Sequence, residues 1–205
     1  MALDKVKQAV DLGCGNGAIS LILAARLPGL KLSGVEIQEK MVERARRSVE
    51  YNRLEKQVEI IQGDFREIDK YLPPGSAELV LSNPPFWSKG EGRLSRNPEE
   101  ALARHEISMT LNDLIRAATY LLCSGGSFGV IHRAERLDDV LACCRANKLV
   151  PVRLRTIHSF WQQDAKLVLV EAQKKERGQL KILPPLIIYK KPGEYSEEIR
   201  SEEHT

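Results

Sequence analysis

Strand-like and helix-like segments alternate along this chain from its first residues. Short apolar segments, typical of buried strands, are separated by segments in which apolar residues recur with the period of a helix. Strands are expected at residues 8–12, 30–37, 58–62, 77–82, 127–132, 150–157 and 166–171, and helices at 18–26, 40–52, 111–122 and 136–147. A turn is expected at Ser124-Gly125-Gly126. Such alternation predicts an α/β fold in which helices cover both faces of a mostly parallel sheet.

Length and composition fit one globular domain. The 205 residues are 42% hydrophobic and 29% charged, an ordinary balance for one sizeable core. We expect the domain to span residues 1–190. Residues 191–205 are charged and poor in apolar side chains, and we expect a disordered tail there. The polar stretch at residues 88–104 has no clear period and is predicted to be a functional or disordered loop.

The chain carries no sign of a membrane or secreted protein. Its longest apolar run, at residues 21–25, is far too short to span a bilayer. Residues 1–7 lack the apolar core of a signal peptide. The four cysteines lack zinc-binding spacing, so we expect reduced thiols, no metal and a cytoplasmic location. The net charge of +3 permits an acidic partner without requiring one.

The first chemical signal is a glycine-rich turn between the first strand and the first helix, Asp11-Leu12-Gly13-Cys14-Gly15-Asn16-Gly17. Glycines let the backbone bend sharply and let a ligand approach without meeting a Cβ atom. The following helix offers free N–H groups at its N-terminus. The GxGxG spacing differs from the GxGxxG of dinucleotide-binding proteins. A purely structural turn is the alternative.

A carboxylate follows each of the next two strands. Glu36 ends the second strand, near the spacing expected for a side chain that binds ribose hydroxyls. Asp64 follows the third strand, where it would accept a hydrogen bond from an adenine amine while Phe65 lies beside the ring. The alternatives are a solvent-exposed strand end for Glu36 and a helix N-cap for Asp64. Three such sites after three consecutive parallel strands fall on the edge where this architecture binds ligands.

The sharpest signal is Asn83-Pro84-Pro85-Phe86 at the end of the fourth strand. The prolines fix the backbone, so that the Pro84 carbonyl and the Asn83 amide present two acceptors to one point. A planar amine is a poor nucleophile because its lone pair is delocalised into the ring. Two acceptors for its hydrogens favour a tetrahedral nitrogen able to attack a methyl group, which stabilises the transition state more than the ground state. Phe86, helped by Trp87, would stack on the substrate base; a plain Pro-Pro turn is the alternative.

These motifs together resemble a known family. DLGCGNG at residues 11–17, GVEIQ at 34–38, GDF at 63–65 and NPPFW at 83–87 are similar to the class I S-adenosylmethionine-dependent methyltransferases. Within them, the chain is most similar to the bacterial group that methylates N6 of the adenine next to the anticodon in valine tRNA. Segments ARHE at 103–106, HR at 132–133 and LPPL at 183–186 support that subgroup. The resemblance extends to about residue 195, although the family usually carries a further segment before the first strand.

The resemblance implies a Rossmann-like fold with a seven-stranded, mostly parallel sheet whose last strand pair is antiparallel. It also implies S-adenosylmethionine as cofactor, S-adenosylhomocysteine as product, and RNA, most of all tRNA, as partner. The implied cofactor-binding residues are Asp11, Gly13, Gly15, Asn16, Gly17, Glu36, Ile37, Asp64, Phe65 and Asn83. The implied catalytic residues are Asn83, Pro84, Pro85 and Phe86, and the implied substrate-binding residues are Phe86, Trp87, Arg93, Arg96 and Arg104. The three arginines would contact phosphates, with a simple mobile lid as the alternative.

Four other functions remain open at this point. A guanine-N2 methyltransferase of ribosomal RNA would use a similar NPPF motif. A protein glutamine methyltransferase also acts on a planar nitrogen, but it usually has tyrosine at the position of Phe86 and a separate N-terminal helical domain. A cofactor-binding module without activity would not need the acceptors of Asn83 and Pro84. A dinucleotide-dependent oxidoreductase is disfavoured by the glycine spacing.

Overall fold

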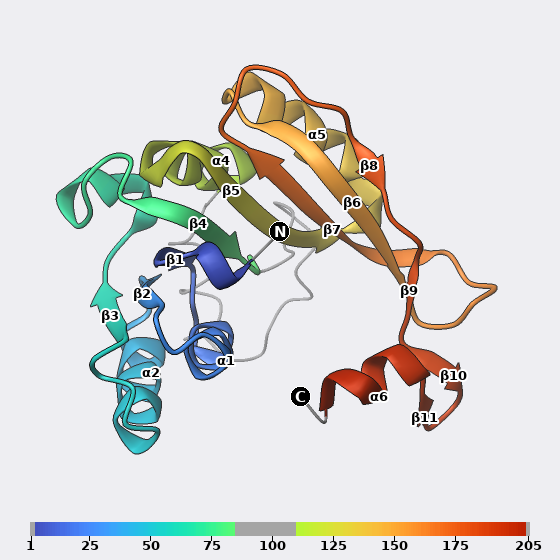
Figure 1. The fold of residues 1–205 in the computed structure, drawn as a ribbon, viewed down its shortest axis with the longest axis horizontal. Helices are drawn as coiled ribbons and strands as arrows, with labels where there is room; N and C mark the ends of the chain where they lie inside the picture. The colour runs from blue at the N-terminus through green and yellow to red at the C-terminus, as the bar shows by residue number, and fades with distance from the viewer. Residues whose placement is uncertain (1–2, 85–109, 204–205) are drawn as a thin grey trace, which may run out of the picture.

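The computed structural model describes residues 3–84 and 110–203 (Figure 1). Within these ranges a nine-stranded sheet has the order β3-β2-β1-β4-β5-β7-β6-β8, with β9 beside β6. Its strands are β1 (Gln8–Leu12), β2 (Lys31–Glu36), β3 (Val58–Gln62), β4 (Ala77–Ser82), β5 (Leu122–Arg133), β6 (Val150–His158), β7 (Ala165–Gln173), β8 (Lys181–Ile182) and β9 (Leu186–Ile187). A separate small hairpin is formed by β10 (Tyr189–Lys191) and β11 (Glu194–Tyr195).

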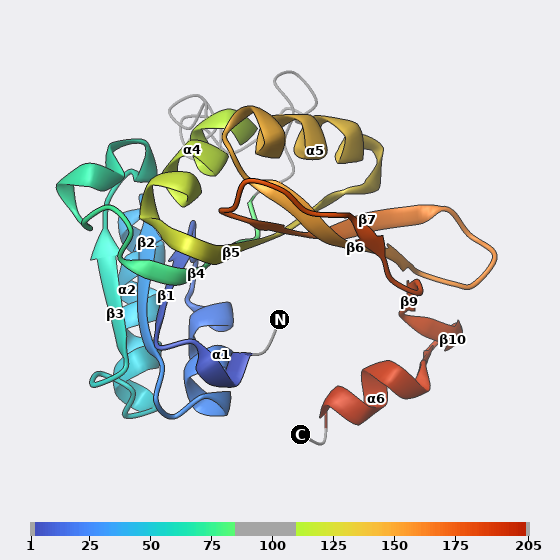
Figure 2. The same cartoon turned by 45° about the horizontal axis from the view of Figure 1, so that its top comes forward.

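Helices lie on both faces of the sheet (Figure 2). The α-helices are α1 (Ala18–Arg26), α2 (Glu39–Tyr51), α4 (Leu111–Leu121), α5 (Leu137–Ala146) and α6 (Glu197–Glu203), and the short 3-10 helices are η1 (Leu3–Lys5), η2 (Phe65–Lys70) and η3 (Ala134–Arg136). In the described ranges no helix is long and apolar enough to cross a membrane.

The pairing of the strands confirms the predicted sheet. Strands β1 to β5 pair in parallel with one another, whereas β7 is antiparallel to both β5 and β6. All seven predicted strands are present, and β8 and β9 add two residues each at the β6 edge. The chain order reverses between β1 and β4, which is where an open α/β sheet binds its ligand. This is the Rossmann-like, mostly parallel sheet with an antiparallel last pair that the sequence predicted.

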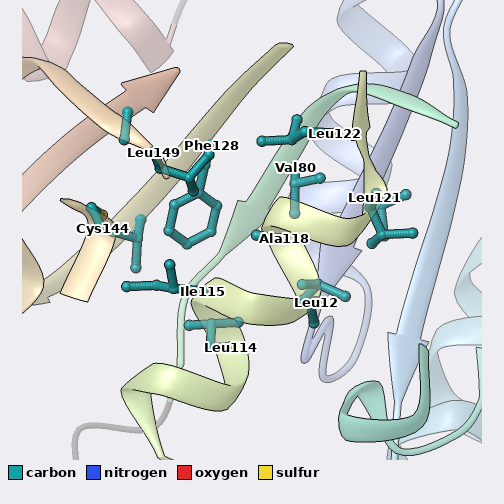
Figure 3. Close-up of a cluster of buried hydrophobic side chains, with 14 of the residues drawn as sticks. Leu12, Val80, Leu114, Ile115, Ala118, Leu121, Leu122, Phe128, Cys144 and Leu149 are labelled. Carbon is teal, nitrogen blue, oxygen red and sulfur yellow. The ribbon is translucent and has the colours of Figure 1, made fainter. Parts of the chain in front are cut away.

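Two cores form because side chains alternate between the faces of each strand. Ala9 and Leu79 face α1 and α2, where they pack with Ala45 and its neighbours. The next residues, Val10 and Val80, face α4 and α5. On that side Phe128 is fully buried against residues from both helices, as Figure 3 shows: Leu114, Ile115, Cys144 and Leu149 surround it. The two cores hold the carboxyl ends of β1, β2 and β4 in fixed positions.

The turn expected at Ser124-Gly125-Gly126 lies inside β5 instead. The strand starts at Leu122, directly after α4, and its register against β4 shifts between Ala77 and Leu79. Gly125 donates its N–H to the carbonyl of Lys174 at 2.8 Å, and Lys174 donates its own to Gly126 at 2.9 Å. These long-range bonds make the glycines part of a bulged strand, which local sequence could not reveal.

The end of the chain also differs from the expected disordered tail. Residues 191–205 include the end of β10, β11 and α6. The rings of Tyr189 and Tyr195 stack with centroids 5.1 Å apart. Arg155 on β6 forms an ion pair with Glu198 on α6, with 2.7 Å between Nη1 and Oε1. A segment poor in apolar residues is thus held by a few contacts with the main sheet.

Candidate functional site

The parallel register brings the predicted site residues to one edge of the sheet. Leu12 on β1 pairs with Val35 on β2, and Glu36 pairs with Gln62 on β3. On the other side of β1, the hydroxyl of Ser82 donates a 2.7 Å hydrogen bond to the carbonyl of Leu12. The glycine turn, Glu36, Asp64 and Asn83 therefore all follow strands that end side by side.

The glycine turn requires its glycines for backbone reasons. Gly13, Gly15 and Gly17 have φ angles of 71°, 56° and 81°, a region that other residues rarely adopt. A Cβ atom on Gly13 or Gly15 would meet nothing within 4 Å, so the space above these two residues is open. A Cβ atom on Gly17 would lie 3.3 Å from that of Ala45 on α2. The turn thus packs closely on the protein side and leaves an open backbone surface on the other.

Glu36 is a buried anchor of that turn. Its side chain is 6% exposed, so the alternative of a solvent-exposed strand end is wrong. Oε2 accepts the N–H of Gly15 and Oε1 accepts the N–H of Gln38, both at 2.9 Å. Each carboxylate oxygen retains capacity for a further hydrogen bond. The geometry therefore fits a side chain that fixes the turn and also receives hydroxyl groups of a ligand.

Asp11 supplies an unpaired buried oxygen next to the turn. The side chain is 1% exposed; Oδ2 accepts the hydroxyl of Ser20 at 2.9 Å, while Oδ1 has no partner among the described residues. Burial raises the pKa of this carboxyl to about 6, and the charge of Glu36 adds to the rise although Ser20 opposes it. An unsatisfied carboxylate oxygen beside a helix start fits a cationic donor such as the amino group of S-adenosylmethionine. The residues present therefore fit this cofactor.

Cys14 packs beneath the turn as a neutral thiol. Burial first, then the charges of Asp11 and Glu36, raise its pKa to about 12. A Cβ atom on Gly34 of β2 would lie 2.8 Å from the Cys14 sulfur. The close approach of β2 to the turn therefore depends on a glycine at position 34.

Asp64 has the N-cap geometry that the sequence left open as an alternative. Its Oδ1 accepts the backbone N–H of Arg66 at 2.9 Å, and its Oδ2 accepts Nε of the same residue at 2.7 Å. Partial burial alone would raise the pKa of Asp64, but the hydrogen bonds and charge of Arg66 outweigh it and hold that pKa below its ordinary value. The carboxylate stays ionised and able to accept, and its contact with adenine remains a prediction.

Phe65 does not lie where the sequence analysis placed it. Its side chain is 5% exposed and belongs to the core on the α4 side of the sheet. Because η2 begins at Phe65, the chain turns at this residue and directs its ring inward. The ring is thus used for packing, which corrects the expectation that it lies beside the cofactor's adenine.

The remaining predicted residues divide between surface positions and an undescribed segment. Asn83 is exposed and Pro84 half-buried directly after β4, and Ile37 is half-buried after β2. Asn16 is exposed, and its Oδ1 accepts the N–H of Ala18 at 3.3 Å at the start of α1. The predicted residues outside the described ranges are Pro85, Phe86, Trp87, Arg93, Arg96 and Arg104.

Two serines belong to the site although the sequence analysis missed them. Ser20 is 0% exposed and donates to Asp11, whereas Ser82 is 4% exposed and ties β4 to β1. Each was visible as a single polar residue within an apolar run, on a helix for Ser20 and at a strand end for Ser82. A buried hydroxyl needs a partner, so such residues indicate a polar group nearby.

A groove of about 380 Å³ adjoins the end of β4 on the α1 side of the sheet. Its lining is mostly apolar and includes Ile19, Leu81, Ser82, Ile131 and Leu169. Glu36 and Asp64 are not part of its wall, so it is distinct from the surface above the glycine turn. It reaches the residue immediately before Asn83.

Comparison with known proteins identifies the family of the chain. The family model described as methyltransferase small domain matches residues 1–142. Curated relatives named tRNA1(Val) (adenine(37)-N6)-methyltransferase include one from Porphyromonas gingivalis, 28% identical over 94% of this chain and 76% of its own length. Another, from Aeromonas hydrophila, is 26% identical over 93% of this chain and 78% of its own length.

Solved structures show the same architecture. A predicted O-methyltransferase from Agrobacterium tumefaciens is 25% identical with a TM-score of 0.78, over 98% of this chain and 90% of that one. Geranyl diphosphate C-methyltransferase from Streptomyces coelicolor, solved with S-adenosyl-L-homocysteine, has a TM-score of 0.59 at 15% identity, over 82% of this chain and 71% of that one. The names of these proteins differ in the atom that is methylated. By its family model and its motifs, the chain belongs to the methyltransferase small domain family and is an S-adenosylmethionine-dependent methyltransferase.

Proposed function

We propose that this protein methylates N6 of an adenine in RNA, and that its substrate is the adenine next to the anticodon of valine tRNA. The observation that carries the proposal is the position of Asn83. Its amide is exposed directly after β4, and the preceding Ser82 is bonded to the carbonyl of Leu12 at 2.7 Å. An acceptor side chain is thus held beside the turn that would bind the methyl donor.

Different residues at this edge of the sheet would bind different parts of the cofactor. The open backbone of Gly13 and Gly15 would hold the methionine part of the cofactor, with its amino group on the free oxygen of Asp11. Glu36 would accept the ribose hydroxyls, and Asp64 the adenine amine. When bound, S-adenosylmethionine supplies an electrophilic methyl group.

Asn83 and Pro84 would act on the target nitrogen. The N6 amine of adenine has two hydrogens and a lone pair delocalised into the ring. Its hydrogens would be accepted by the Asn83 amide oxygen and the Pro84 carbonyl, which favours a tetrahedral nitrogen with a localised lone pair. The nitrogen becomes acidic only after methyl transfer, so water suffices to remove the proton. Phe86 and Trp87 would stack on the base, and Arg93, Arg96 and Arg104 would contact RNA phosphates.

The choice of a tRNA adenine rests on the sequence subgroup and on the curated relatives of that name. A tRNA substrate would place the reaction in the cytoplasm. Stacking and flipping of the target are easier in a single-stranded loop than in a duplex, which suits an anticodon loop. Guanine-N2 methylation of ribosomal RNA and glutamine methylation of protein are the competing reactions.

The test is methyl transfer from isotope-labelled S-adenosylmethionine to fractionated RNA, followed by nucleoside analysis. We expect N6-methyladenosine in the valine tRNA fraction, and loss of the label when the adenine beside the anticodon is replaced by guanosine. Label recovered as N2-methylguanosine, or in protein in place of RNA, would overturn the proposal. Asn83→Ala serves as the enzyme control, because it removes an acceptor without touching the glycine turn.

A further inference from the structure

The loop that joins β6 to β7 lies at the same edge of the sheet as the methyltransferase site. Val130 on β5 pairs with Ser82 at the end of β4, and Arg133 at the end of β5 pairs with Leu167 near the start of β7. β4 ends at Ser82, level with Val130 and Val170, and the β6–β7 hairpin continues beyond that level before the loop at residues 159–164 (Figure 1, orange loop). Strands are spaced about 4.8 Å apart, so β6 lies roughly 15 Å to the side of β4, and the residues of β7 from Val170 back to Ala165 carry the loop roughly a further 17 Å along the strands.

This loop has an ordered base. The His158 ring contacts the carbonyl of Gln163 at 2.7 Å and the hydroxyl of Thr156 at 3.0 Å through its two nitrogens. Gln163 in turn donates its N–H to the carbonyl of Phe160 at 3.1 Å. Through its carbonyl and its N–H, Gln163 thus links the end of the loop to His158 and Phe160 at its start. These links limit the positions available to residue 161.

The C-terminal segment supports the loop from the side. The ring of Phe160 lies 5.6 Å from that of Tyr189, which stacks on Tyr195 at 5.1 Å. Tyr189 also donates its N–H to the carbonyl of Ser159 at 2.9 Å. Three aromatic rings and a backbone bond thus connect the base of the loop to the C-terminal hairpin.

The ring of Trp161, the next residue of the loop, does not join the packed rings of Phe160, Tyr189 and Tyr195. Its side chain is 71% exposed, next to the half-buried Phe160. Lysines accompany it: Lys166 follows the loop on β7, and Lys190 follows Tyr189, both exposed. Asp164 is the acid within the loop, whereas Glu194 is already paired with Lys191 at 3.1 Å. An exposed aromatic ring with exposed lysines on the neighbouring strands suits an unpaired nucleic-acid base next to phosphates, although Glu197 and Glu198 at the start of α6 add negative charge to the same C-terminal segment.

We propose that Trp161 stacks on an unpaired base of the RNA substrate, outside the target adenine. The inference rests on the RNA substrate proposed above and adds a second contact surface to it. The loop lies beyond the carboxyl edge of the sheet, on the order of 20 Å from the end of β4, so an RNA that extends at least this far from the target adenine would reach both Asn83 and Trp161. Stacking on tryptophan tolerates any base, and Trp161 would therefore set RNA affinity without reading the target itself.

The experiment compares Trp161→Ala and Trp161→Phe with a matched control, Tyr51→Ala. Tyr51 is also an exposed aromatic residue, at 89%, but it ends α2 on the way to the start of β3, at the opposite edge of the sheet. The probe is a fluorescently labelled anticodon stem-loop of valine tRNA, bound in the presence of saturating S-adenosylhomocysteine. Steady-state methyl transfer to the whole tRNA is measured in parallel.

Trp161→Ala is expected to raise Kd and KM for RNA roughly 5- to 150-fold, the equivalent of one lost stacked base. Its kcat, its affinity for S-adenosylhomocysteine and its melting temperature should match those of the unmodified protein, because the side chain makes few internal contacts. Trp161→Phe should retain most of the affinity, and Tyr51→Ala all of it.

Three outcomes would overturn the inference. Unchanged RNA affinity in Trp161→Ala, with normal methylation of RNA by the unmodified protein, removes Trp161 and leaves the proposed function standing. A lowered melting temperature or weaker cofactor binding would assign Trp161 a structural role. Failure of the unmodified protein to bind or methylate any RNA would remove the proposed function and this surface together.

Discussion

The carboxylate of Glu36 accepts a hydrogen bond from the backbone N–H of Gly15 at 2.9 Å, which joins the end of β2 to the turn after β1. The second oxygen accepts the N–H of Gln38 at 2.9 Å. Both oxygens thus face backbone donors. The side chain proposed to bind the ribose also determines the shape of the surface on which the cofactor would lie.

Glu36→Gln is therefore expected to be nearly as damaging as Glu36→Ala. The amide group of glutamine must face one of the two backbone N–H groups, donor against donor. We expect a loss of about 1–3 kcal/mol in affinity for S-adenosylhomocysteine and a comparable loss in the free energy of unfolding. Calorimetry and denaturant titration measure the two quantities, with the exposed Glu50→Gln on α2 as control. Unchanged affinity in Glu36→Gln would remove Glu36 from the cofactor site.

We expect the buried carboxylate of Asp11 to lower the stability of the folded protein while it favours cofactor binding. Its pKa rises from 3.8 to about 6 on folding, so the folded state binds the proton more tightly than the unfolded state. The resulting cost to stability is absent below about pH 4, grows between pH 4 and 6, and is complete above that range. Asp11→Asn keeps an acceptor for Ser20, and we expect it to raise the free energy of unfolding at pH 7.5 by at most about 3 kcal/mol.

Asp11→Asn should bind the cofactor product more weakly, although the same substitution raises stability. Only the ionised Asp11 attracts the amino group, so the affinity of the unmodified protein for S-adenosylhomocysteine should increase as pH rises through about 6. At pH 7.5 Asp11→Asn should bind S-adenosylhomocysteine more weakly. Its affinity should also lack the increase expected as the pH rises through about 6. Calorimetry from pH 5 to 8 provides the comparison. A step of equal size in both proteins would assign the titration to another group.

Gly34→Ala should destabilise the protein through its contact with Cys14. The new methyl group would lie 2.8 Å from the Cys14 sulfur and 3.0 Å from Cδ1 of Ile60. Overpacking of this kind costs about 1–3 kcal/mol in unfolding free energy. The second substitution Cys14→Ala removes the sulfur and should recover part of that loss in a double-mutant cycle. Strict additivity of the two changes would show that the contact is not the cause.

Asn83→Ala tests the chemistry apart from the binding. Loss of the Asn83 amide should lower the methyl-transfer rate about a hundredfold or more, by analogy with the loss of one preorganised donor in an oxyanion hole. Cofactor affinity should change far less than the rate, because the glycine turn, Asp11 and Glu36 would supply most of the proposed cofactor contacts. Single-turnover transfer at saturating cofactor, with the RNA concentration varied, separates the two. A near-normal rate at saturating RNA would contradict the proposed role in amine methylation.

The sequence predicted the sheet and the edge that carries the site because both depend on local pattern. Apolar periodicity located seven strands, and β1 to β7 follow them within a few residues except at the start of β5. Parallel strands end together, so the positions of Gly13, Glu36, Asp64 and Asn83 along the chain sufficed to place them on one edge. The left-handed backbone of the turn was likewise indicated by its glycines.

Contacts between distant residues decided the rest. The sequence gives no sign that Phe65 turns into the core, that Gly125 pairs with Lys174, or that Arg155 holds Glu198 and with it the end of the chain. The unpaired oxygen of Asp11 and its raised pKa depend on what α1 and Glu36 bring beside it. Periodicity reports which face of an element is apolar, whereas burial, charge and hydrogen-bond partners are set by the elements packed against it, and these are fixed only in the folded chain.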